Sequence, residues 1–141
     1  DMNLGEWKVD IVGDGPYKDF LEKKSKENNL QDVVRFHGWL DNKSQEMKDF
    51  YGHASIFISA SWFENMSIVL LEALASGCNV IASNVGGNPE VVKKENLFEA
   101  KNIQSLRDKI KKEINKENRP IKLDKKFDWD NIIKKYEGVL K

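Results

Sequence analysis

Two glutamates flank the expected start of an apolar helix. Glu64 follows a short apolar stretch, and Glu72 comes after seven intervening residues, inside the apolar run 67–76. The first backbone N–H groups of a helix lack partners within it, and with the helix dipole they attract an anion such as a diphosphate. Because Glu64 would stand close to that diphosphate, a neutral or cationic group must lie between them. A sugar attached to the diphosphate fits this requirement.

Glu72 raises a separate question, because the run 67–76 is apolar almost all round and is therefore expected to be buried. A buried carboxylate needs hydrogen-bond donors, since leaving it unpaired is costly. The hydroxyls of a ribose would serve. An exposed strip of the helix explains Glu72 equally well, and Glu64 taken alone is more typical of an ordinary exposed loop carboxylate.

The elements that must position these residues alternate along the chain. Short apolar stretches predict strands, and amphipathic or apolar stretches between them predict helices. The predicted strands cover 7–12, 33–36, 55–58 and 79–82, and the predicted helices cover 17–28, 45–51, 67–76, 89–93, 103–115 and 129–140. This order predicts a Rossmann-like open α/β fold, with a parallel sheet covered by helices on both faces.

In folds of this kind, ligands bind beyond the carboxyl ends of the strands. The rule selects four loops, and the residues with unusual chemistry are concentrated in them: 13–16, 37–42, 60–67 and 83–88. Within the third loop, Trp62 and Phe63 either shape a ligand cleft or close the core.

Composition narrows the classes of protein further. The 141 residues fit one domain, and 23 Lys and Arg residues balance 23 Asp and Glu residues, which argues against a nucleic-acid partner. Cys78 is the sole cysteine, so no intramolecular disulfide forms, and its apolar surroundings predict a core position. A reducing cytoplasm is the expected location. No apolar run approaches the roughly 20 residues that span a bilayer.

Several other chemistries are disfavoured. The loop Gly13–Pro16 lacks the third glycine of a dinucleotide fingerprint and the Gly-Lys-Ser/Thr of a phosphate-binding Walker loop. The sequence contains no Gly-x-Ser-x-Gly elbow, so a hydrolase of that type is disfavoured. His37 and His53 have no flanking cysteine or carboxylate cluster, so a metal site is not expected. The lysine-rich region 101–126 favours a solvated helix face over a membrane-surface patch.

Four stretches, taken in order, carry a resemblance to a known family. The first is Ile11–Pro16, and the second is the Glu-x7-Glu pattern within 61–77. The third is 79–90, and the fourth is Phe127-Asp128-Trp129 ahead of a closing helix. Together they resemble the GT-B retaining glycosyltransferases, especially glycosyltransferase family 4, over nearly the whole chain. The resemblance implies the C-terminal, donor-binding half of a GT-B fold, with residues 1–126 as a partial Rossmann-like domain whose first strand is missing and 127–141 as a closing helix.

The resemblance also assigns roles to residues. Glu64 would be the catalytic residue that contacts the hydroxyls of the transferred sugar, and Glu72 would accept hydrogen bonds from the ribose. His37 either touches the base or is a plain loop residue. The other donor-binding residues would be Asn65, Met66, Ser67 and Ile68 for sugar and diphosphate, Gly13 and Gly15 for close backbone approach, and Gly38, Trp39 and Leu40 for the base pocket. Asn65 stands where many relatives carry Gly, and Asn tolerates a positive φ better than most residues.

The activity implied by the resemblance is transfer of a hexose or HexNAc from a UDP- or GDP-sugar, with retention, in bacterial surface polysaccharide or glycoconjugate synthesis. Neither a metal nor a cofactor is expected. An N-terminal domain absent from this chain would bind a glycan or lipid-linked acceptor, and an upstream Arg and Lys would neutralise the diphosphate. The chain alone is therefore expected to be inactive, and the enzyme to be cytoplasmic or peripheral at the inner membrane face. A non-catalytic nucleotide-sugar binding module and a GT-B sugar-nucleotide epimerase are the alternatives.

Overall fold

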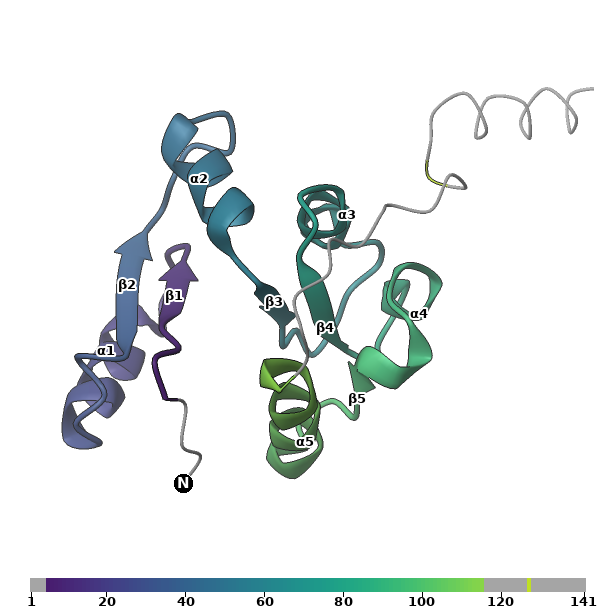
Figure 1. Cartoon of the computed structure of the whole chain (residues 1–141). Coiled ribbons are helices and arrows are strands. Elements are labelled where there is room, and N and C mark those ends of the chain that lie inside the picture. Colours follow the sequence, from purple (N-terminus) through teal and green to yellow (C-terminus); the bar gives the residue numbers. More distant parts are fainter. Residues whose placement is uncertain (1–4, 116–126, 128–141) are drawn as a thin grey trace, which may run out of the picture. The chain divides into compact units, whose positions relative to one another are not determined.

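The architecture comes from a computed structural model that describes residues 5–115 and Phe127. The chain divides into two compact units, Asp1–Asp49 and Phe50–Lys141, and each is considered by itself (Figure 1). The predicted helix 129–140, and the Asp128-Trp129 part of the aromatic signature, lie outside the described residues.

The first unit is a β–α–β arrangement. Strand β1 (Val9–Val12) and strand β2 (Val34–Gly38) pair in parallel, with Val9 opposite Val34, and helix α1 (Lys18–Glu27) connects them. A helical crossover is the usual way to join two parallel strands, because the chain must return to the same edge of the sheet. Helix α2 (Gln45–His53) follows β2, and the boundary between the units falls within it.

The second unit holds a three-stranded parallel sheet in the order β3-β4-β5, with β4 in the middle. Helices alternate with its strands along the chain. The elements are β3 (Ile56–Ser59), α3 (Ile68–Ala75), β4 (Asn79–Ser83), α4 (Asn88–Val91), the 3-10 turn η1 (Lys94–Asn96), β5 (Leu97–Phe98) and α5 (Ile103–Ile114).

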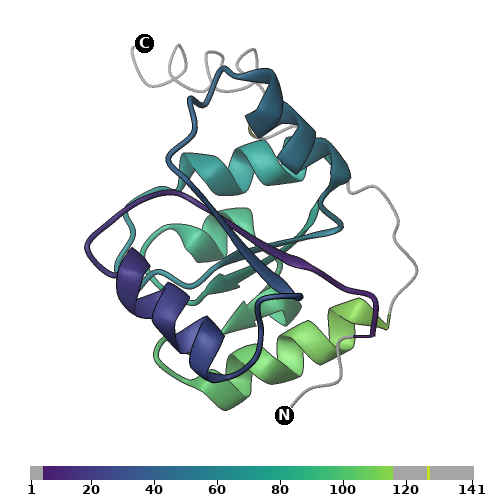
Figure 2. The same cartoon turned by 90° about the vertical axis from the view of Figure 1, so that its left-hand side faces the viewer.

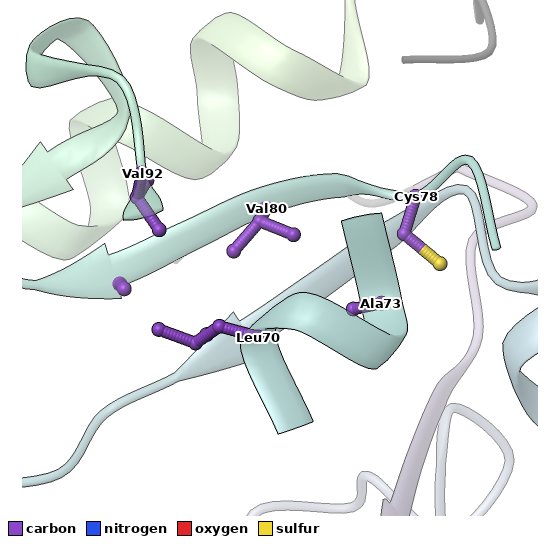
Figure 3. Close-up of a cluster of buried hydrophobic side chains, with 6 residues drawn as sticks. Leu70, Ala73, Cys78, Val80 and Val92 are labelled. Atoms are coloured by element: carbon purple, nitrogen blue, oxygen red, sulfur yellow. The ribbon is translucent and has the colours of Figure 1, made fainter. Parts of the chain in front are cut away.

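Strand β4 is the core of the second unit, and all five of its residues are buried. Successive side chains of a strand point to opposite faces. Val80 belongs to an apolar cluster with Leu70 and Ala73 of α3 (Figure 3). Ile81, fully buried, therefore points to the other face, where α5 contacts β4 (Figure 2). The middle strand is thus covered on both sides.

The predicted α/β class with parallel strands and flanking helices is confirmed. Each strand and helix predicted within the described residues is present, with ends that differ by two residues or fewer. The five strands described are distributed over two parallel sheets, one in each unit. Strand β5 was not predicted, because an apolar pair such as Leu97-Phe98 is too short to show a strand pattern. No helix within residues 5–115 has both the length and the apolar character needed to cross a membrane.

One expectation about burial was wrong. Helix α3 was expected to be buried almost all round, yet Ile68 and Val69 in its first turn are exposed. The helix lies against one face of the sheet, so only the side chains on that side, Leu70 and Ala73, are fully buried. The predicted core position of Cys78 is correct: the residue is fully buried, and burial raises the pKa of its thiol.

Replacing Leu70 by Ala should lower the free energy of unfolding by about 3 kcal/mol, since it leaves a cavity in a fully buried apolar cluster. Urea denaturation of the chain measures the change. Val69→Ala is the matched control on the same helix, and because Val69 is exposed it should cost less than about 1 kcal/mol. Equal losses for the two variants would contradict the packing described.

Candidate functional site

The loop between β3 and α3 carries the first of the two predicted glutamates. Glu64 lies beyond the carboxyl end of β3, as the sequence predicted, and is half-buried. Its carboxylate is held locally, because Ser61 Oγ donates a hydrogen bond to Glu64 Oε1 at 2.9 Å. Among the described residues, Glu64 Oε2 has no protein donor. One carboxylate oxygen is therefore fixed, and no donor within residues 5–115 engages the other.

A second loop, which follows β4, fastens the Glu64 loop. Ser83 Oγ donates to the carbonyl of Ser61 at 2.6 Å, and Gly87 N donates to the carbonyl of Asn65 at 2.8 Å. Gly86 and Gly87 permit this approach because neither has a side chain. A Cβ at Gly86 would overlap the carbonyl of Glu64, and one at Gly87 would overlap the carbonyl of Asn65. The two loops are in backbone contact.

The second glutamate, Glu72, is part-buried on α3 and has a protein partner. Tyr51, from α2, donates its hydroxyl to Glu72 Oε2 at 2.9 Å, and its ring stacks on Phe57 with centroids 5.9 Å apart. Burial, together with the hydrogen bond to Glu72 and its charge, raises the pKa of Tyr51 above its usual value, so the phenol stays protonated. Glu72 is therefore neither fully buried nor fully exposed, and its carboxylate has a donor within the protein. Tyr51 thus supplies one of the donors that a carboxylate at this position needs.

The start of α3 leaves its first amides without a side-chain cap. Ser67 occupies the N-cap in an extended conformation, is 4% exposed, and makes no side-chain capping hydrogen bond. Asn65, Met66 and Ile68 are exposed around it. Asn65 does not use the tolerance for positive φ that was expected of it, because only Asn29 and Lys101 among the described non-glycine residues have a positive φ.

The remaining predicted donor-binding residues lie in the first unit, at the carboxyl ends of β1 and β2. Gly13 N donates to the carbonyl of Gly38 at 2.7 Å, which brings these two loops together. Gly13 and Gly15 both face open space, Trp39 is 72% exposed and Leu40 is half-buried. That these residues share one cleft with Glu64 and Glu72 stays a prediction.

His37 was open between a base contact and a plain loop position. It lies within β2, and its Nε2 is 2.7 Å from Oδ1 of Asp10 on β1. This side chain therefore bridges the two paired strands. No group of three or more His, Cys, Asp or Glu side chains with metal-binding geometry occurs among the residues that the structure describes.

The residues that sequence reasoning missed are those that hold the glutamates: Tyr51, Ser61, Ser83 and the contact made by Gly86 and Gly87. Their sequence signal is weak, since Ser and Gly at strand ends are ordinary. The suggestion that Trp62 and Phe63 close the core is wrong, because they are 73% and 80% exposed. Lys101 Nζ lies 4.8 Å from the centre of the Trp62 ring, a cation–π contact.

The parallel strands, the flanking helices and the glutamate loop at a strand end define a Rossmann-like α/β domain of the GT-B type. Comparison with known proteins gives the family. The chain belongs to the family "Glycosyl transferases group 1", whose sequence pattern matches residues 2–128. The resemblance seen in the sequence is confirmed.

Relatives and solved structures agree with this family. Protein CapJ of Staphylococcus aureus is 29% identical over 131 residues, which cover 93% of this chain and 31% of CapJ. The apo lipopolysaccharide outer core galactosyltransferase WaaB superposes with a TM-score of 0.82 at 23% identity, over 96% of this chain and 41% of WaaB. Anabaena HepE in complex with UDP-glucose gives a TM-score of 0.68 at 23% identity, over 77% of this chain and 31% of HepE. The chain spans about a third of CapJ and two fifths of WaaB.

The backbone contact between the two loops is testable by adding one methyl group. Gly87→Ala should lower the free energy of unfolding by about 1–3 kcal/mol, because the new Cβ overlaps a backbone carbonyl and one loop must move. Gly52→Ala is the control: it lies inside α2 with open space around it, and should stabilise the helix by about 0.5–1 kcal/mol. Chemical denaturation of both variants measures these changes in the free energy of unfolding. A Gly87→Ala protein as stable as the original would refute the contact.

Proposed function

We propose that this chain is the nucleotide-sugar-binding part of a retaining glycosyltransferase that moves a hexose or HexNAc from a UDP- or GDP-sugar. The observation that carries the proposal is Glu64, tethered through one carboxylate oxygen with the other available, directly ahead of an uncapped helix start. Membership of the glycosyl transferases group 1 family supports the reaction class. The UDP-glucose bound by HepE supports the class of donor.

In this proposal the donor diphosphate lies at the start of α3. The amides of residues 65–68 and the helix dipole stabilise its negative charge. Cations supplied by other parts of the enzyme complete the neutralisation, so that no metal is required. Glu72 accepts hydrogen bonds from the ribose through the oxygen that Tyr51 leaves free. The nucleotide contacts proposed in the first unit are those implied by the family resemblance: Gly13, Gly15, Gly38, Trp39 and Leu40.

Glu64 acts on the sugar itself. Its free oxygen accepts hydrogen bonds from the sugar hydroxyls and so fixes the ring, while the acceptor attacks from the face that the leaving diphosphate occupies. The leaving phosphate then takes the acceptor's proton. Glu64 positions the sugar and forms no covalent bond. A glycan or lipid-linked acceptor binds to another domain of the enzyme, which works in the cytoplasm or at the inner membrane face, in bacterial polysaccharide or glycoconjugate synthesis.

The test uses the protein expressed from the complete reading frame that encodes this chain, with a panel of UDP- and GDP-sugars and release of nucleotide as the readout. Glu64→Ala should lower kcat by about 100-fold with nucleotide affinity retained, since it removes a group that orients the sugar. Glu72→Gln should weaken nucleotide binding by about tenfold or more, because a hydrogen bond to a charged group contributes about 1.5–3 kcal/mol.

The exposed Glu95 provides a matched control, and Glu95→Gln should change neither quantity. Nucleotide binding without turnover of any donor would favour a non-catalytic binding module. Conversion of the donor into its epimer would favour an epimerase. The 141-residue chain alone should turn over no nucleotide sugar, and calorimetry measures its binding of UDP and GDP. Turnover by this chain would refute the proposal that other parts of the enzyme are needed.

A further inference from the structure

Two hydrogen bonds, one to the carbonyl of Ser61 and one from its hydroxyl, form a relay from the end of β4 to the carboxylate of Glu64. Ser83, the last residue of β4, is fully buried, and its hydroxyl donates to the carbonyl of Ser61 at 2.6 Å. The hydroxyl of Ser61 then donates to Glu64 Oε1 at 2.9 Å. Both bonds run in the same direction, from the sheet toward the carboxylate.

The origin of the relay is rigid. Asn88 is fully buried, and its Nδ2 donates to the carbonyl of Ser83 at 3.0 Å. Ser83 also pairs with Phe98 in the register of β4 and β5. Because β4 is buried on both faces, the anchor of the relay cannot shift without disturbing the core of the second unit.

The backbone on both sides of Glu64 is held as well. The carbonyl of Ser61, three residues before it, is bound by Ser83, and the carbonyl of Asn65, directly after it, is bound by Gly87. Fixed backbone leaves the side-chain torsions of Glu64 as the main remaining freedom. Ser61 restricts these torsions, because within the described residues its hydroxyl is the donor to the Glu64 carboxylate.

We infer that Ser61 is a positioning residue, which orients the Glu64 carboxylate toward the transferred sugar and is itself anchored to the sheet by Ser83. The inference rests on the proposed function, in which Glu64 contacts the sugar. Engaging Oε1 directs Oε2 to the substrate. A site of this kind needs its contact groups locked by supporting hydrogen bonds, because a small misplacement costs rate more than binding.

The experiment compares Ser61→Ala with Ser61→Thr in the protein from the complete reading frame. Ser61 is only half-buried, so both variants should fold with an unchanged Tm. Ser61→Ala should lower kcat by about tenfold, the size expected for one hydrogen bond to a charged group, with the Kd for UDP or GDP unchanged. Ser61→Thr keeps the hydroxyl and should restore kcat to within about threefold of the original.

A double-mutant cycle with Glu64→Ala separates positioning from a general structural role. If Ser61 acts through Glu64, removing it from the Glu64→Ala protein should change the single-turnover rate by less than about twofold. The same tenfold loss in both backgrounds, or a Thr variant no better than the Ala variant, would overturn the inference. If Glu64→Ala leaves turnover intact, the proposed function fails. If Glu64→Ala is slow but Ser61→Ala is normal, the inference alone fails.

Discussion

The contact on which the glutamate loop depends is between two stretches of backbone. Because β3 and β4 are parallel neighbours, their carboxyl ends lie at the same edge of the sheet, and the loops that follow them meet. Gly86 and Gly87 lie so close to the carbonyls of Glu64 and Asn65 that any side chain would overlap them. The same meeting of loops places Gly87 N on the carbonyl of Asn65 and the Ser83 hydroxyl on the carbonyl of Ser61.

The strands, the helices and the position of Glu64 could be predicted because local patterns in the sequence encode them. Short apolar stretches predicted the strands, and the position of Glu64 after one of them placed it beyond the carboxyl end of β3. The sequence did not predict β5, since Leu97-Phe98 is too short to show a pattern. Nor did it predict that Ser83 supports the loop, because that role depends on a pairing of strands that no local pattern specifies.

The expected surroundings of Glu72 were incomplete. A carboxylate on an apolar helix was expected to need external donors, and a ribose was suggested. The structure supplies Tyr51, which comes from 21 residues earlier in the chain, so part of that need is met within the protein. Under the proposed function, a ribose would add to the hydrogen bonding of Glu72 and would not be its sole source. The Glu72 carboxylate is therefore stabilised by Tyr51 whether or not a nucleotide is bound.

The exposed positions of the Glu64 loop have a consequence for its evolution. The carbonyl of Ser61 is bound by Ser83 of β4, and that of Asn65 by Gly87 in the loop that follows β4. The side chains of Trp62, Phe63 and Met66 on the same loop are exposed, and the Trp62 ring contacts only Lys101 among the contacts described. Substitutions at these three sites leave the ties intact and so carry little folding penalty. Selection is therefore free to vary them, and a combinatorial library confined to them would change the exposed surface of this loop on an unchanged scaffold.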